Sequence, residues 1–157
     1  MDKFAPLLHD KVFHWGYVVH NMDRAVKTWT RIGSRMVVPP AIDQIQRVCC
    51  ALLLFESAVL IELVAPIDED SPIKKRLARG GGLDHVCFFA DDVAIELSAL
   101  NDRGAVTVVP PCYGEVFDRE LAFAMTRGGL LVEVMSRKVS GRLPKDPLSQ
   151  LSFAKFA

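Results

Sequence analysis

The sequence lacks an excess of charge, a membrane-length apolar run and a secretory leader. Its 19 basic and 19 acidic residues give a formal net charge of zero, whereas proteins that bind a phosphate backbone usually carry a basic face or a basic excess. The longest apolar run, Val48 to Phe55, has the length of a buried strand, and a helix that spans a bilayer needs about 20 apolar residues. The N-terminal residues show no basic segment followed by an apolar run. We therefore expect a protein that binds neither nucleic acid nor membrane and is not secreted.

Cysteine is also scarce. The chain has Cys49, Cys50, Cys87 and Cys112, which form no Cys-x-x-Cys pair. The adjacent Cys49 and Cys50 should point to opposite faces of a strand. We interpret all four as reduced thiols that behave as small apolar residues. Reduced cysteines are typical of the cytoplasm, which is the location we expect.

A repeat with an offset of 71 positions runs through the chain. The offset leads from His14 to His85, and from Glu62 to Glu133, each time between similar apolar stretches. Two pairs of helix-boundary residues show the same offset of 71 positions, namely Asn21 with Asp92 and Gly33 with Gly104. Four matching pairs at one offset indicate a duplicated module with one His and one Glu in each copy.

The pattern within each copy predicts the order βαβββ. Its strand stretches are rich in β-branched and aromatic residues, and its helices run from a polar cap to a glycine with apolar residues at helical spacing. In the first copy we expect strand 12–19, helix 22–32 and strands 35–38, 48–55 and 59–64. In the second we expect strand 83–90, helix 92–102 and strands 105–109, 120–126 and 130–136. At 157 residues, half of them hydrophobic, the chain suits one domain or two small modules that share a core.

Proline and glycine mark the expected boundaries. Pro39-Pro40 is expected to end regular structure, and 110–114 is expected to form a loop. Ser71 is expected to cap a short helix that begins at Pro72 and ends near Arg79. The predicted segments are a first module 12–66, a linker with a short helix 67–82, a second module 83–137 and a C-terminal tail 138–157. The tail is polar, with a few apolar residues that could dock on a surface: Leu148, Leu151, Phe153 and Phe156.

The repeated His and Glu residues have the chemistry of a metal site. If the two copies face each other, His14, Glu62, His85 and Glu133 converge on one cavity, and two imidazoles with two carboxylates suit a divalent transition ion. A single histidine in a strand is more commonly structural, and a glutamate between apolar residues can face solvent on an edge strand. In both copies, however, the Glu follows the His by 48 positions (14 to 62, and 85 to 133). An ionised carboxylate is also costly to bury without a partner. We therefore predict a four-ligand metal site.

At these residues the chain resembles a known family. The two βαβββ units, with a His in the first strand and a Glu in the last, resemble the vicinal oxygen chelate superfamily, which includes glyoxalase and bleomycin-resistance proteins. Within residues 12–137 the resemblance is greatest to methylmalonyl-CoA epimerases. The stretches that carry it are Ile61-Glu62-Leu63-Val64-Ala65-Pro66, Asp70-Ser71-Pro72-Ile73-Lys74-Lys75-Arg76-Leu77, Gly82-Leu83-Asp84-His85-Val86, Leu121-Ala122-Phe123 and Gly128-Gly129-Leu130-Leu131-Val132-Glu133.

The resemblance implies a fold and a reaction. The fold is α+β, with two tandem βαβββ modules forming a curved mixed sheet around a central cavity. His14, Glu62, His85 and Glu133 fall on the family's metal-ligand positions, the second of which is often Gln. A divalent ion (Co, Ni, Mn, Zn or Fe) would act as a Lewis acid on substrate oxygens, and Glu133 would remove a proton next to the carbonyl. The implied substrate is an acyl thioester of coenzyme A or of a carrier protein, and the implied assembly is a homodimer.

Further candidate site residues are Gln46, Tyr113 and Lys74. Gln46 falls where the epimerases have a second catalytic Glu, but a neutral amide cannot exchange protons near pH 7 as a carboxylate does. Asp43 could replace that Glu only if the loop is shifted. Tyr113 is a candidate substrate contact in its loop, although an ordinary turn is the simpler interpretation. Lys74 lies in a basic segment that could bind an anionic handle or be a solvated face.

Three hypotheses for the function follow. The favoured one is a metal-dependent isomerase or lyase that acts next to a carbonyl. The second is a dioxygenase on the same fold, but its iron usually takes two His and one carboxylate, so the additional Glu62 counts against it. The third is a non-catalytic protein that binds a small molecule in the same cavity.

Overall fold

The computed structural model describes residues 12–56 and 59–152. Residues outside this range include 1–11, Ser57 and Ala58, and the tail residues Phe153 and Phe156. The first module contains β1 (His14–Val18), α1 (Met22–Arg31), β2 (Arg35–Asp43), β3 (Val48–Leu54) and β4 (Leu60–Pro66). After α2 (Lys74–Ala78), the second contains β5 (Gly82–Ala90), α3 (Val93–Asp102), β6 (Val106–Gly114), β7 (Arg119–Met125) and β8 (Leu131–Ser136). The order βαβββ therefore occurs twice, as predicted.

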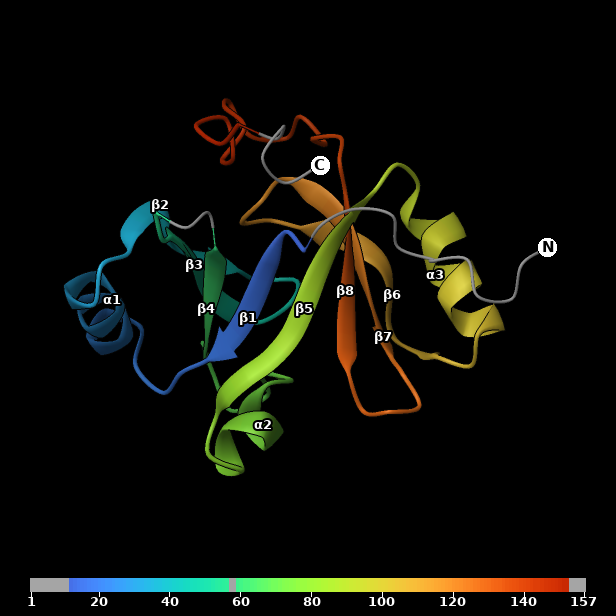
Figure 1. The fold of residues 1–157 in the computed structure, drawn as a ribbon, viewed down its shortest axis with the longest axis horizontal. Coiled ribbons are helices and arrows are strands. Elements are labelled where there is room, and N and C mark those ends of the chain that lie inside the picture. Colours follow the sequence, from blue (N-terminus) through green and yellow to red (C-terminus); the bar gives the residue numbers. More distant parts are fainter. Residues whose placement is uncertain (1–11, 57–58, 153–157) are drawn as a thin grey trace.

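The eight strands of the described residues form one curved mixed sheet with the order β2-β3-β4-β1-β5-β8-β7-β6 (Figure 1). Within each module the first strand pairs in parallel with the last, β1 with β4 and β5 with β8. The two modules join where β1 pairs antiparallel with β5. The predicted α+β fold is confirmed, and the four strands that carry the repeated His and Glu residues occupy its centre.

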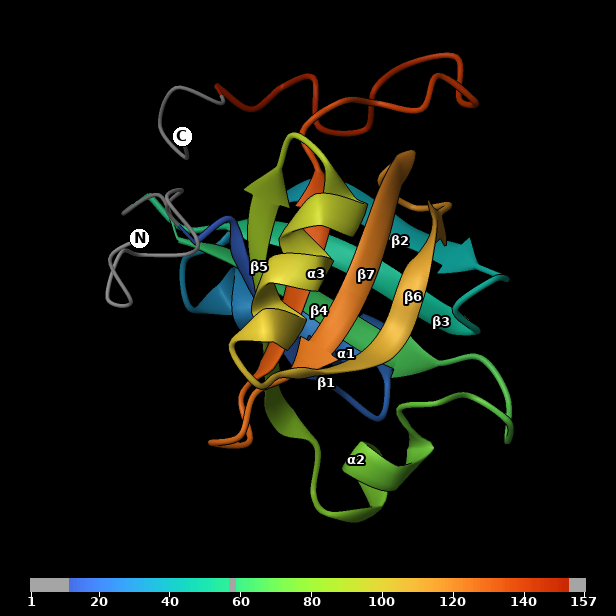
Figure 2. The same ribbon diagram turned by 90° about the vertical axis from the view of Figure 1, so that its right-hand side faces the viewer.

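The helices α1 and α3 cover the outer side of the sheet and leave its concave side open (Figures 1 and 2). Asn21 caps α1 by accepting a hydrogen bond from Arg24 N at 2.8 Å, and Asp92 caps α3 by accepting one from Ile95 N at 2.9 Å. These polar caps follow the 71-residue offset, so the local signal for both helices is confirmed. None of the described helices is long and apolar enough to cross a membrane.

Three local predictions were wrong. Pro39-Pro40 does not end the strand, because β2 continues to Asp43, and the predicted loop at 110–114 is the second half of β6. Both proline pairs lie in edge strands where the pairing register shifts. A missing N–H is tolerated at such positions. In the linker, Ser71 does not cap α2, since the helix begins at Lys74 and the buried Ser71 hydroxyl has no hydrogen-bond partner within residues 12–56 and 59–152.

The C-terminal tail docks on one end of the sheet. Leu148 and Leu151 are buried in the core against residues that include Phe13 and Met135. The guanidinium of Arg119 donates to both carboxylate oxygens of Asp146 at 2.8 and 2.9 Å. The predicted docking of the tail is therefore confirmed for its described residues.

The tips of the β2–β3 and β6–β7 hairpins contact each other. Arg47 and Asp118, 71 positions apart, both adopt a positive φ, of 58° and 53°. Glu115 N donates to the Asp43 carboxylate at 2.8 Å, and the Glu115 carboxylate accepts from the backbone of Gln44 and Ile45. These contacts bring the two edges of the curved sheet together beside its concave face.

Candidate metal centre

The four predicted ligands come from the four central strands, one from each. Gly16 on β1 pairs with Glu62 on β4 and with His85 on β5. Cys87 on β5 pairs with His14 on β1 and with Glu133 on β8. The first row across the sheet holds Glu62, Gly16 and His85, and the second holds His14, Cys87 and Glu133. Because residues two positions apart share a face of a strand, both rows present their side chains on the same face.

Gly16 makes room for the cluster. A Cβ atom at this position would overlap the imidazole ring of His85. A glycine inside a strand is a known signal of close approach by another group. Gly16 had no predicted role from the sequence, although a glycine within a strand is visible there.

The donor atoms form a tight, buried group. Nε2 of His14 lies 3.2 Å from Oε2 of Glu62 and 3.1 Å from Oε2 of Glu133. Nε2 of His85 lies 3.1 and 3.3 Å from the same two oxygens. One ligand atom from each of the four residues lies within 4.8 Å of all the others, and none of the four residues is more than 5 % exposed. The structure therefore brings together all four residues that the sequence singled out as ligands.

The four side chains alter one another's protonation. Burial alone would lower the pKa of His14, but the charge on Glu62 and hydrogen bonds to both glutamates raise it. Burial is likewise outweighed at His85, where hydrogen bonds to Asp84, Glu133 and Glu62 raise the pKa well above its ordinary value. Burial would raise the pKa of both glutamates, but the imidazoles reverse this effect and lower both. The imidazoles and the carboxylates therefore favour each other's charged forms.

A second layer of side chains orients His85. Asp84 Oδ2 lies 2.9 Å from His85 Nδ1, and the Arg76 guanidinium lies 3.9 Å from the other Asp84 oxygen. Arg76 also donates to the Leu83 carbonyl at 2.8 Å. A carboxylate on the outer nitrogen of a metal-binding histidine typically fixes the ring's orientation. Asp84 and Arg76 had no assigned part in this arrangement from sequence alone.

The donor set fits a divalent transition-metal ion. Two imidazole nitrogens and two carboxylate oxygens are donors that such ions accept. With neutral histidines the two glutamates carry a charge of −2, which is costly to bury and which a divalent cation would balance. Asp84 occupies Nδ1 of His85 and leaves its Nε2 directed at the other donors. His14, Glu62, His85 and Glu133 are therefore the residues that would hold the ion.

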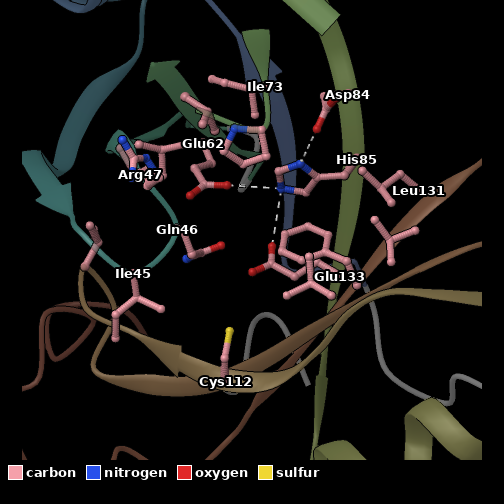
Figure 3. Close-up of a pocket in the computed structure, with 18 of the residues that line it drawn as sticks. Ile45, Gln46, Arg47, Glu62, Ile73, Asp84, His85, Cys112, Leu131 and Glu133 are labelled. Atoms are coloured by element: carbon pink, nitrogen blue, oxygen red, sulfur yellow. Dashed lines mark hydrogen bonds and ion pairs between the residues drawn. The ribbon is translucent and has the colours of Figure 1, made fainter. Parts of the chain in front are cut away.

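The cluster lies at the wall of a cavity of about 540 Å³ on the concave side of the sheet (Figure 3). Glu62, His85 and Glu133 line this cavity, whereas the fully buried His14 lies behind them. The rest of the lining is largely apolar and comes from both modules, including Val48, Val64, Ile73, Val108, Phe117, Phe123 and Leu131. The cavity can therefore hold a small, mostly apolar molecule with one polar end at the cluster.

The other predicted site residues are placed differently. Gln46 lines the cavity (Figure 3). Lys74 is not among the lining residues and pairs with Glu69 at 3.1 Å, whereas Arg76 of the same helix does line the cavity. Asp43 is fully buried and is also absent from the lining.

Tyr113 lies outside the main cavity. Its hydroxyl donates to Asp118 at 2.8 Å, and Arg142 covers its ring with the guanidinium carbon 4.0 Å from the ring centre. Burial and the hydrogen bond to Asp118 raise the pKa of Tyr113 to about 12. Tyr113 instead lines a smaller hollow beside the C-terminal tail.

Comparisons with known proteins agree with this fold. Methylmalonyl-CoA epimerase from Mycobacterium tuberculosis has a TM-score of 0.74 and 27 % identity, covering 87 % of this chain and 93 % of that one. Streptomyces coelicolor methylmalonyl-CoA epimerase in complex with 2-nitronate-propionyl-CoA has a TM-score of 0.69 and 24 % identity, over 80 % of this chain and 96 % of that one. A hypothetical protein from Bacillus halodurans has a TM-score of 0.72 and 22 % identity, over 83 % of this chain and 96 % of that one.

A search of curated protein sequences gives no match. A family model, described as the glyoxalase/bleomycin resistance protein/dioxygenase superfamily, matches residues 13–123. That match spans most of both βαβββ modules and three of the four clustered donors. The chain therefore belongs to the glyoxalase/bleomycin resistance protein/dioxygenase superfamily, the vicinal oxygen chelate proteins.

Proposed function

We propose that the protein is a metal-dependent, epimerase-like isomerase that removes a proton from the carbon next to a carbonyl group. The observation that carries this proposal is the cluster of His14, Glu62, His85 and Glu133, whose donor atoms lie within 4.8 Å of one another at the wall of a 540 Å³ cavity. A divalent ion held by these residues would supply Lewis acidity at the substrate's oxygens. The chain's own residues supply the base and the cavity.

Glu133 is the proposed base. It lines the cavity, so a bound substrate can reach its carboxylate. Burial would raise its pKa, but hydrogen bonds and charge from His14 and His85 lower it, so the carboxylate is ionised at neutral pH. An ionised carboxylate beside the substrate's α-carbon can accept a proton.

The proposed substrate is an acyl thioester. The apolar lining suits an acyl chain, and the similar epimerase from Streptomyces coelicolor was solved with 2-nitronate-propionyl-CoA. The handle would be coenzyme A or a carrier protein. Arg76 at the cavity and Lys74 on the same short helix are the proposed contacts for an anionic handle. We also propose a homodimer in the cytoplasm, and sedimentation analysis of the pure protein tests the dimer.

The metal proposal is tested first by binding. The wild type is expected to bind one Co²⁺ or Mn²⁺ per chain. The variant His85→Ala should lose this binding, because it removes a donor from the centre of the cluster. His20→Ala is the matched control, since His20 is exposed. Stoichiometric binding by His85→Ala equal to that of the wild type would contradict the site.

The reaction is tested by isotope exchange. The metal-loaded protein in D₂O is expected to incorporate deuterium at the α-carbon of propanoyl-coenzyme A or methylmalonyl-coenzyme A, as followed by mass spectrometry. Glu133→Gln should slow exchange by about 10²–10⁴-fold, the usual contribution of a general base. Thioester binding without exchange would instead support the alternative of a non-catalytic binding protein, which the apolar cavity also suits. An activity that requires O₂ would point to a dioxygenase.

A further inference from the structure

Gln46 reaches the cavity from the loop between β2 and β3, and two hydrogen bonds hold it. Its side-chain Nε2 donates to Asp43 Oδ2 at 2.8 Å, and its backbone N donates to Asp43 Oδ1 at 2.8 Å. Asp43 is fully buried and also accepts from Glu115 N at 2.8 Å, across the contact between the two hairpin tips. The Gln46 amide is therefore attached to a part of the fold that both modules build.

These contacts determine which end of the amide faces the cavity. The carboxylate of Asp43 receives three N–H groups and acts only as an acceptor. The amide must turn its NH₂ end toward Asp43, because its carbonyl oxygen would repel the carboxylate. In Figure 3 the oxygen of Gln46 points toward the side of the cavity that holds Glu133, and the nitrogen points the other way.

The same contact explains why a neutral amide suits this position. A glutamate at position 46 in this conformation would place a second carboxylate in hydrogen-bond contact with Asp43, where like charges repel. Gln46 offers the acceptor oxygen of a carboxylate without that charge. Because a neutral amide is too weakly basic to take up a proton near pH 7, this oxygen can receive a hydrogen bond but cannot serve as a second base.

We infer that Gln46, across the cavity from Glu133, is a specificity-determining residue. Its amide oxygen selects substrates that present an O–H or N–H donor to it. This inference rests on the proposed function, in which a small carbonyl compound binds at the four-donor cluster. A substrate without the donor leaves the amide oxygen unpaired in a largely apolar cavity. Sites built to bond a hydroxyl group reject analogues that lack it for this reason.

The test compares two thioesters of N-acetylcysteamine, 2-hydroxypropanoyl and 2-methylpropanoyl, which differ by a hydroxyl in place of a methyl group. Their dissociation constants are measured by calorimetry with Co²⁺-loaded protein. The wild type is expected to prefer the hydroxylated thioester, and Gln46→Met, of similar shape but without the acceptor, should reduce that preference about 10-fold or more. Gln44→Met is the matched control, because Gln44 is an exposed residue of the same loop that contacts Glu115 through its backbone.

The comparison between variants separates Gln46 from the metal, which also attracts a hydroxyl group. A preference that is equal in the wild type and in Gln46→Met overturns the inference, as does a failure of the wild type to bind either thioester. The deuterium exchange experiment is read independently. Exchange with an unchanged preference leaves the proposed function standing and removes the role of Gln46. A preference that changes in Gln46→Met, without deuterium exchange in the wild type, supports the role of Gln46 and contradicts proton removal by this protein.

Discussion

Asp84 Oδ2 lies 2.9 Å from Nδ1 of the neighbouring His85, and the described part of the first module shows no equivalent contact. The residue before His14 is Phe13, and Nδ1 of the buried His14 has no hydrogen-bond partner among the described residues. The two halves of the donor cluster are therefore unequal. The outer nitrogen of His85 faces a carboxylate, whereas the rings of Phe13 and Phe117 lie beside the His14 imidazole.

This inequality predicts that Asp84→Ala weakens metal binding without removing a donor. Loss of a carboxylate behind a metal-bound histidine typically costs about 10–100-fold in affinity. Competition with a chromophoric chelator measures the change. Asp91→Ala is the control, because the Asp91 carboxylate is 87 % exposed and pairs with Arg137 away from the cluster. An Asp84→Ala affinity equal to that of the control would show that His85 needs no orienting partner.

Gly16→Ala should abolish the site by steric means. The new methyl group would occupy the space of the His85 ring, so the imidazole must leave the cluster. We expect loss of stoichiometric Co²⁺ binding in a protein that still shows the circular dichroism of a folded mixed sheet. Gly128→Ala serves as the control, since Gly128 is exposed and an added Cβ meets nothing closer than 4.0 Å. A metal site that survives Gly16→Ala would rule out the arrangement of these two residues.

Removal of the metal should destabilise the fold. A divalent ion held by the folded cluster, whose proposed donors come from four strands, would have no comparable site in the unfolded chain. At a free concentration 1,000 times the dissociation constant, it would add about 4 kcal/mol to the free energy of unfolding. For a chain of this size that corresponds to a rise in Tm of roughly 8–16 °C. Scanning calorimetry with chelator and with Co²⁺ checks this, and an equal shift in His85→Ala would assign the effect to another site.

Acid should release the C-terminal tail from the sheet. Hydrogen bonds from Arg119 hold the pKa of Asp146 below its ordinary value, against the opposing effect of burial. A lowered pKa stabilises the folded state above the ordinary value, and this stabilisation is lost as the pH falls through the lowered one. The protection of residues 138–152 against hydrogen exchange, relative to the intrinsic rate at each pH, should therefore fall below about pH 4. Asp146→Asn should show reduced protection already at pH 7, and equal protection in both proteins would exclude this anchor.

Much of the fold could be predicted because its signals are local. The caps Asn21 and Asp92 lie next to the helices they begin, and strand composition alone indicated most of the strands. The error at Pro39-Pro40 has a physical reason. Proline ends a strand where its missing N–H is needed, but β2 is an edge strand, and only the assembled sheet shows which strands lie at the edge.

The sequence by itself determined the duplication, the βαβββ order and the four residues able to bind a metal, because a repeat carries residue type and spacing along the chain. Only the tertiary structure decided how those residues meet. The register of β1 against β4 and β5 places Gly16 between Glu62 and His85. Contact between hairpin tips about 71 residues apart places Asp43 behind Gln46 and turns its amide oxygen into the cavity. Such relationships depend on pairing between distant segments, and no local pattern records them.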